Sequence, residues 1–282
     1  MALALVSDML READKRHAGI VGFNTFNYEE VEWIIEAAEA EQVPAIIMLH
    51  PDMAYFSNIS FEAHAQMTKA LAERVSVPIG LHLDHCEDFN EIMHAIKAGF
   101  TSVMIDGSKL PFEENVAITR KVVDVAHAMG VCVEGELGRI GQAANREDFL
   151  NEDIYTKVED AVAFVERTQV DSLAVAIGSA HGFYVETPHL ALDRLKAIND
   201  AIDTPLVLHG GSGIPDDQIT IAGQNGINKL NVGTEYGHLL YTNTRKIMEE
   251  GLSPREDWMW CMGALKPVMI EYLRRKLHAL SY

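Results

Sequence analysis

The residues best suited to chemistry come in one short stretch, in which His82, Asp84 and His85 stand close together. The apolar run before them predicts a buried strand over 77–81, and the spacing after them predicts a helix over 87–98. Two imidazoles and a carboxylate therefore lie at the end of a core strand, where polar groups need partners. A metal ion or a proton-transfer site would supply them. The structural alternative is a packed histidine, a capping aspartate and an exposed histidine.

Eight units of a strand followed by a helix position this stretch. The predicted strands cover 20–24, 43–49, 77–81, 101–105, 131–133, 172–177, 205–208 and 227–232. The predicted helices cover 29–41, 61–75, 87–98, 112–129, 158–168, 190–202 and 216–225. Such alternation favours a parallel sheet, and eight units favour an α/β (β/α)₈ TIM barrel over a doubly wound open sheet. We expect one domain over 1–282, with a C-terminal helical extension over 236–282.

A barrel brings the ends of its strands to one face, where barrel enzymes place their active sites. His181 and His209 follow the sixth and seventh predicted strands, each directly before a glycine. Histidines from separate strands suit zinc, because imidazole is a borderline ligand and three protein ligands leave a position for substrate. The alternation of side chains along a strand does not decide whether His82 or His85 is the third ligand. His82 shares a face with Asp84, whereas His85 lies at or past the end of the strand.

Two glycine-containing loops follow the seventh and eighth predicted strands, at 210–213 and 231–234. Loops at these places commonly bind phosphate in barrels, and bare backbone amides can hold an anion without a lysine. The alternative is that the glycines only permit tight turns. Because both loops lie beside the histidine-bearing strand ends, we favour phosphate binding.

The composition narrows the choice of partner and compartment. The 282 residues include 42 acidic and 23 basic side chains, for a formal charge of −19, which disfavours nucleic acid and anionic membranes. Three widely spaced cysteines give no disulfide framework, so we expect a reducing cytoplasm. The apolar N-terminal run is too short for a signal sequence, and no run reaches the length of a membrane span.

Six motifs together resemble the class II, zinc-dependent ketose-bisphosphate aldolases, a family that includes the fructose- and tagatose-bisphosphate enzymes. The resemblance runs in order from about residue 22 to residue 235. The motifs are LHLDH at 81–85, MIDGS at 104–108, VEGELG at 133–138, DSLAVAIGSAHG at 171–182, LVLHGGSG at 206–213 and NVGTE at 231–235.

The resemblance implies a metal-dependent lyase that reversibly cleaves a ketose phosphate between C3 and C4. The products would be dihydroxyacetone phosphate and an aldehyde, and the substrate would be a sugar such as fructose or tagatose 1,6-bisphosphate. The implied zinc ligands are His85, His181 and His209. Asp84 would exchange a proton with the aldehyde-derived oxygen, while zinc polarises the carbonyl of the ketone half.

The remaining implied residues bind substrate or lie near the metal. Asn24 would lie beside the ketone half, with a sodium or potassium ion nearby as in relatives. The implied phosphate ligands are Gly182, Gly210, Gly211, Ser212, Asn231, Gly233 and Thr234. Asp106 and Glu136 match positions near the metal, where a second metal site and a purely structural role remain alternatives. Since relatives form dimers or larger assemblies, we expect a homodimer or homotetramer.

Three places depart from the family pattern. The loop in which relatives carry a proton-transferring glutamate has two alanines at the expected acidic positions. Glu147 is the predicted replacement, with Asp148 or a base elsewhere in the chain as alternatives. His50 stands in a region where a small hydroxyl residue is usual, and Val185 where many fructose enzymes have a lysine. These differences leave two further hypotheses: an aldolase for a non-standard sugar phosphate, and a phosphosugar-binding barrel without catalysis.

Overall fold

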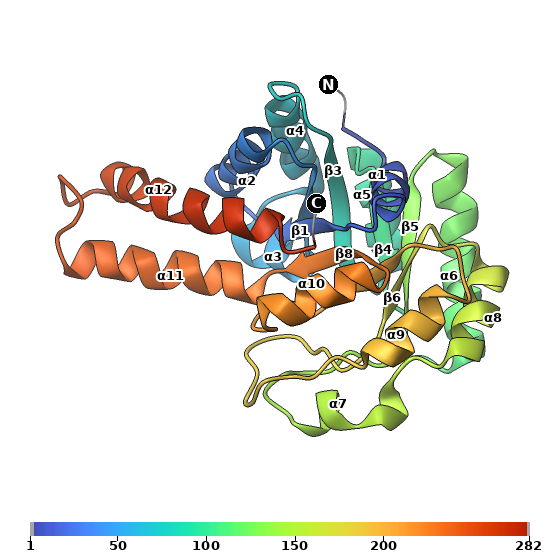
Figure 1. Ribbon diagram of the computed structural model, residues 1–282. Coiled ribbons are helices and arrows are strands. Elements are labelled where there is room, and N and C mark those ends of the chain that lie inside the picture. The colour runs from blue at the N-terminus through green and yellow to red at the C-terminus, as the bar shows by residue number, and fades with distance from the viewer. Residues whose placement is uncertain (1–2, 281–282) are drawn as a thin grey trace.

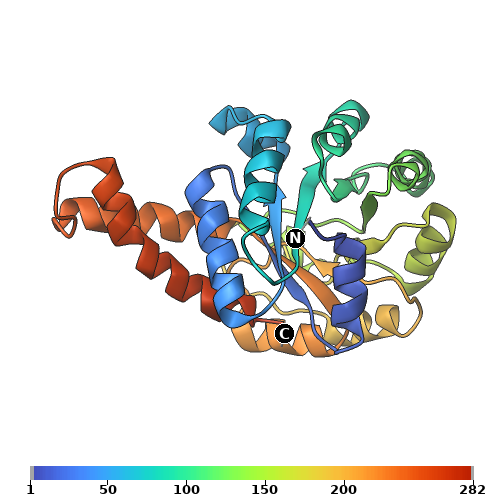
Figure 2. The ribbon, with the colours of Figure 1, turned by 90° about the horizontal axis from the view of Figure 1, so that it is seen from above.

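Eight parallel strands pair in chain order and close into a barrel, with β8 beside β1 (Figure 2). The structure is a computed structural model that describes residues 3–280. The strands are β1 (Ile20–Asn24), β2 (Ala45–Leu49), β3 (Ile79–Cys86), β4 (Ser102–Ile105), β5 (Cys132–Leu137), β6 (Ser172–Val175), β7 (Leu206–Leu208) and β8 (Ile227–Val232). This arrangement confirms the predicted (β/α)₈ barrel and excludes the open sheet.

Helices surround the barrel and cover its strands (Figure 1). Those between successive strands are α2 (Tyr28–Glu41), α3 (Pro51–Ser57), α4 (Phe61–Ala72), α5 (Phe89–Ala98), α6 (Phe112–Ala128), α7 (Glu147–Leu150), α8 (Val158–Thr168), α9 (Leu192–Asn199) and α10 (Asp216–Gln224), with a 3-10 turn at Glu152–Ile154. Local signals set several of their ends. Asn27 accepts a hydrogen bond from the Glu30 amide at the start of α2, and Gly99, at φ +106°, ends α5.

The helix α1 (Val6–Asp14) was not predicted from the sequence. Its apolar face packs with Ile20, Ile46, Met48 and Cys132 in a small core separate from the main one. Residue Ala4, just before α1, bridges to Gly80 near the start of β3, so α1 lies at the N-terminal end of the barrel. Its apolar residues, Val6, Met9, Leu10 and Ala13, have helical spacing, but its N-cap, Leu5, makes no capping hydrogen bond through its side chain.

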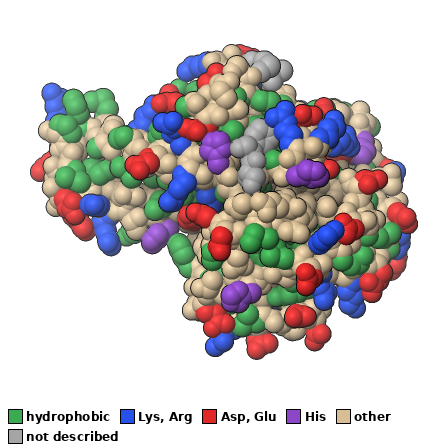
Figure 3. All heavy atoms as spheres, in the orientation of Figure 1, with side chains coloured by type: hydrophobic (Ala, Val, Ile, Leu, Met, Phe, Trp, Pro, Cys, Tyr) green, Lys and Arg blue, Asp and Glu red, His purple; other side chains and the backbone are tan. Residues whose placement is uncertain are grey.

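Two long helices follow β8, α11 (Thr234–Glu249) and α12 (Trp258–Leu277). They run side by side out from the barrel as an arm, and α12 returns to pack on α2 (Figure 1). Hydrophobic side chains are exposed along this arm (Figure 3), and they include Tyr241, Met248, Trp258 and Met259. The last two residues of the predicted extension lie outside the described residues. Within 3–280, no helix is both long and apolar enough to cross a membrane.

Candidate active site

An irregularity in β3 sets the direction of the His85 side chain. The pairing of β3 with β4 shifts by one residue between Leu83 and Cys86, and His85 adopts φ +45°. In a regular strand, His85 would point to the face opposite Asp84. A bulge re-aims a side chain, and here His85 lies with Asp84 at the C-terminal mouth of the barrel. The parity argument fails at this position for that reason.

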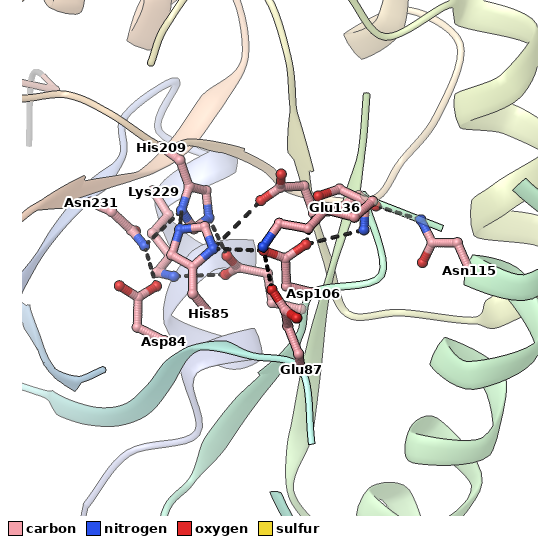
Figure 4. A network of polar contacts seen from close by, with 12 residues as sticks. Asp84, His85, Glu87, Asp106, Asn115, Glu136, His209, Lys229 and Asn231 are labelled. Atoms are coloured by element: carbon pink, nitrogen blue, oxygen red, sulfur yellow. Dashed lines mark hydrogen bonds and ion pairs between the residues drawn. The ribbon is translucent and has the colours of Figure 1, made fainter. Parts of the chain in front are cut away.

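Three histidine rings converge at the mouth. Nε2 of His85 lies 2.7 Å from Nδ1 of His209 (Figure 4), and nitrogens of His85, His181 and His209 all lie within 4.8 Å of one another. Nε2 of His181 is buried and has no hydrogen-bond partner in the described part of the chain. Converging imidazole nitrogens with one orphaned atom fit a divalent metal ion. His82 is instead fully buried deeper in the barrel, where its Nδ1 lies 2.7 Å from the Ser102 hydroxyl.

Carboxylates orient two of these rings. Oε1 of Glu134 lies 2.7 Å from Nε2 of His209, and Oδ2 of Asp106 lies 3.1 Å from Nδ1 of His85. An ionised carboxylate only accepts hydrogen bonds, so each ring nitrogen that faces one is the donor. The other nitrogen of each ring is then available to a metal, as in the carboxylate–histidine pairs of metal enzymes.

The electrostatic environment differs among the three rings. Burial, followed by the nearby His85 and His209, lowers the pKa of His181 to about 3. Burial also lowers the pKa of His209, and a positively charged His85 adds to the effect. Burial also lowers the pKa of His85. The carboxylates of Asp84, Asp106 and Glu136 together outweigh burial and raise this pKa to about 9. A metal ion at His85 would therefore compete with a proton, so its affinity would rise with pH.

Asp84 is held from both sides. Its Oδ1 accepts a hydrogen bond from the Asn231 amide at 2.8 Å, and its Oδ2 accepts one from the Asn24 amide at 2.7 Å. Burial alone would raise the pKa of Asp84, but the electrostatic effect of its neighbours His85, His209 and Lys229 holds it well below its ordinary value. Three strands, β1, β3 and β8, thus present an oriented carboxylate beside the histidines.

The cavity above these residues has a volume of about 780 Å³. The predicted phosphate-binding residues that line it are Gly182, Gly210, Ser212, Asn231, Gly233 and Thr234. Gly211 lies behind this surface, where a Cβ would come 2.4 Å from the Leu230 side chain. Gly210 requires glycine, because at φ +67° a Cβ would lie 2.2 Å from the Ala180 carbonyl oxygen.

The other predicted residues fall into two groups. Glu136 is buried, its Oε2 lies 3.8 Å from Nδ1 of His85, and burial together with Asp106 raises its pKa to about 8. His85, Asp106 and Glu136 form a second group with metal-ligating geometry. Glu147, in contrast, is exposed and does not line the cavity.

The residues that distinguish this chain from its family pattern lie on loops or in the short helix α7. Asp148 lines the cavity in the place where Glu147 was expected, and its Oδ2 accepts a hydrogen bond from the Gln142 amide at 2.9 Å. His50 also lines the cavity, with its ring 6.0 Å from that of His85. Val185 is 58% exposed.

One functional group that the sequence reasoning missed is Lys229. It is fully buried, and its Nζ lies 2.7 Å from Oε2 of Glu134. A signal was present in the sequence: Lys229 and Asn231 occupy alternate positions of one apolar strand, so they share a face. A lysine on the inner face of a barrel strand needs a buried acid.

The fold and this cluster define a barrel whose C-terminal mouth carries three histidines that could hold a metal ion, with an adjacent carboxylate. A family model described as "Fructose-bisphosphate aldolase class-II" matches residues 4–281. The chain belongs to this family of aldolases, which are lyases that generally use a divalent metal.

Relatives support the assignment over the whole chain. A sulfofructosephosphate aldolase from Alkalicoccus urumqiensis is 37% identical over 283 residues, covering 100% of this chain and 97% of the relative. A fructose-bisphosphate aldolase from Geobacillus stearothermophilus is 43% identical over 238 residues, covering 83% and 82%. The crystal structure of the YdjI aldolase from Escherichia coli K12 superimposes with a TM-score of 0.87 at 32% identity, covering 100% and 98%.

Proposed function

We propose that the protein is a zinc-dependent aldolase that reversibly cleaves a ketose 1-phosphate to dihydroxyacetone phosphate and an aldehyde. The observation that carries the proposal is the position of Asp84. Its carboxylate lines the same cavity as His85, His181 and His209, and that cavity continues to the glycine-containing loops after β7 and β8. Binding alone would not need an oriented carboxylate beside an open metal site, so catalysis is favoured over a non-catalytic phosphosugar barrel.

His85, His181 and His209 would hold the metal. Zinc bound there supplies Lewis-acid polarisation of the ketone carbonyl. Asp84 accepts the proton of the C4 hydroxyl as the C3–C4 bond breaks and returns it in the synthetic direction. Asn24 and Asn231 hold the two oxygens of Asp84 in place, which restricts the carboxylate to one orientation.

The phosphate of the ketone half would bind at the loops after β7 and β8. The N-terminus of α11 lies there, with Thr234 as its first residue and the Ser212 hydroxyl accepting from the Glu235 amide. Backbone amides and the helix dipole favour an anion without a basic side chain. We propose a sodium or potassium ion beside this phosphate.

The proton at the dihydroxyacetone carbon needs a second group. The predicted residue, Glu147, points away from the cavity lining, whereas its neighbour Asp148 is part of it. We therefore assign this proton transfer to Asp148, brought to the substrate by movement of the loop that carries it. For Asp106 and Glu136, we favour support of His85 over a second metal site, because Asp106 already accepts a hydrogen bond from that ring.

Two substrate classes compete for the far end of the cavity. Fructose and tagatose 1,6-bisphosphate place a second phosphate there, near Lys109 and Arg139. Acidic side chains also line the cavity, at Asp52, Glu87, Asp88 and Glu91, and Nζ of Lys109 pairs with Glu87 at 2.6 Å. The acidic excess favours the second candidate, a ketose monophosphate whose aldehyde half carries hydroxyl groups instead of phosphate.

The test is release of dihydroxyacetone phosphate from fructose 1,6-bisphosphate, tagatose 1,6-bisphosphate and the two 1-phosphates, with and without EDTA. We expect cleavage that EDTA abolishes and zinc restores. A His181→Ala variant should bind zinc weakly and stay inactive after zinc is added. Cleavage that survives complete removal of the metal would overturn the zinc mechanism, and a strong preference for a bisphosphate would overturn the monophosphate candidate.

Assembly and location complete the proposal. We propose a homodimer or homotetramer, because large hydrophobic side chains such as Trp258 and Met259 are more than half exposed on the arm. We also propose a cytoplasmic location, which is supported by three buried cysteines, Cys86, Cys132 and Cys261, that are all free.

A further inference from the structure

A row of contacting polar and charged side chains lies in the barrel interior behind the histidine cluster. Lys229 on β8 and Glu134 on β5 are both fully buried, and 2.7 Å separates Nζ from Oε2. The other oxygen of Glu134 contacts Nε2 of His209 at 2.7 Å. Glu134 is thus the single residue between the Lys229 amine and the ring of His209, which lines the cavity.

Each oxygen of Glu134 has a distinct main partner. Lys229 holds Oε2, where the Ser172 hydroxyl also donates at 3.4 Å, and His209 contacts Oε1. Because the carboxylate can only accept, Nε2 of His209 carries the proton and Nδ1 presents its lone pair toward His85. If Glu134 rotated or became an amide, that choice of ring nitrogen would no longer be imposed.

We propose that Lys229 is a positioning residue, which fixes Glu134 and through it keeps Nδ1 of His209 unprotonated and aimed at the metal site. The inference rests on the proposed function, since it takes His209 as a metal ligand. Lys229 acts two contacts away from the ion and needs no contact with substrate. Among the described residues, those that line the cavity include His209 and exclude Lys229.

A different role for a buried lysine in an aldolase would be a covalent Schiff base with the ketone. That reaction requires a neutral amine in contact with the substrate. Nζ of Lys229 instead faces an ionised carboxylate inside the barrel wall. Borohydride added with substrate should therefore leave the enzyme active, and inactivation with a label on Lys229 would overturn the positioning role.

The main experiment measures zinc affinity by competition with a chelator at pH 7.5. We compare the wild type with Lys229→Met and with a control, Lys276→Met. Lys276, on α12, is also buried, at 3% exposure, and pairs with Glu235 at 3.1 Å. We expect the zinc dissociation constant to rise about 10- to 100-fold in Lys229→Met and less than threefold in Lys276→Met. Lys229→Arg, which keeps the charge, should recover part of the affinity.

A folded Lys229→Met variant with wild-type zinc affinity would overturn the inference. If that variant does not fold, the double variant Lys229→Met/Glu134→Gln removes the unpaired buried charge. An amide can donate to or accept from Nε2 of His209, so we expect the double variant to fold and still bind zinc weakly. Wild-type affinity in it would contradict the proposal.

The same measurements separate the inference from the function on which it rests. If the wild type binds no zinc, or if the His181→Ala variant binds zinc as tightly as the wild type, the proposed metal centre itself is contradicted. Zinc binding that depends on His181 but not on Lys229 contradicts only the positioning role.

Discussion

The two halves of the cavity are built differently. On one side, Asp84 and Asn231 project from strands and His209 directly follows β7; all three are buried, and each contacts another side chain of the site. On the other side, His50 and Asp148 come from loops or short helices, and the longest of these loops joins β5 to α8. The strand half has its geometry fixed by the barrel, whereas the loop half does not.

From this difference we infer that the strand half carries out catalysis and the loop half selects the substrate. A metal centre and a proton carrier need positions held to within fractions of an ångström, and packed strands with satisfied hydrogen bonds provide them. Recognition of one aldehyde among many can be changed on loops without disturbing the barrel. We therefore expect substitutions in the strand half to lower turnover and those in the loop half to alter substrate preference.

The largest effect is expected from Asp84→Asn. The change keeps the shape of the side chain but removes the base and one acceptor for the two asparagine amides. We expect kcat for cleavage to fall about 10²- to 10⁴-fold, with little change in zinc content. Steady-state kinetics and metal analysis of the purified variant measure both.

The matched control lies in the loop half. Asp52 lines the cavity and is exposed, so Asp52→Asn makes the same chemical change without removing a buried contact. We expect kcat within about threefold of wild type and a shift only in the relative KM values of different sugar phosphates. Equal losses of kcat in the two variants would contradict the division of the cavity.

A second pair of variants tests the loop that joins β5 to α8. Asp148→Asn removes the carboxylate that lines the cavity, while Glu147→Gln makes the equivalent change one residue earlier, on an exposed side chain. If Asp148 moves the proton at the dihydroxyacetone carbon, its variant should exchange that proton with deuterated solvent about 100-fold more slowly. Glu147→Gln should exchange it at nearly the wild-type rate, and the reverse result would restore Glu147 to the role predicted from the sequence.

The barrel could be predicted because strand and helix periodicities alternate eight times. The convergence of His85, His181 and His209 follows from the barrel, because all its strands end on one face. What periodicity cannot supply is the bulge in β3, since the positive φ of His85 arises from pairing with β4 and leaves no mark in the polar pattern. The choice between His82 and His85 therefore came from family resemblance.

The remaining misses have other physical causes. The pairing of Lys229 with Glu134 joins residues 95 positions apart, so each looks like an isolated polar residue in the sequence. Of Glu147 and Asp148, only Asp148 lines the cavity, where its carboxylate accepts a hydrogen bond from the Gln142 amide, a contact that the sequence does not reveal. Tertiary contacts of this kind lie beyond local pattern.

The smallest effect is expected on the free energy of unfolding, and only at acidic pH. It tests whether the strand half depends on buried neutral groups. His64 on α4 is fully buried, with Nε2 3.0 Å from the hydroxyl of Thr25, the residue after Asn24. Burial lowers the pKa of His64 from 6.5 to about 4. As the pH falls, His64 therefore takes up a proton in the unfolded chain before it does so in the folded protein. The contribution of His64 to the free energy of unfolding is intact above pH 6.5 and falls by about 3 kcal/mol as the pH drops to 4.

Urea unfolding at several pH values between 7.5 and 4 measures this loss. In His64→Phe, which cannot titrate, stability should fall less steeply with acid than in the wild type. His94→Phe is the control on the neighbouring helix, because His94 is half exposed, and it should keep the wild-type slope. If His64→Phe and the wild type lose stability in parallel, His64 is already charged or solvated in the folded protein. The wall behind Asn24 would then be as open to water as the loops, and the contrast between the two halves of the cavity would be smaller than the burial of the strand residues implies.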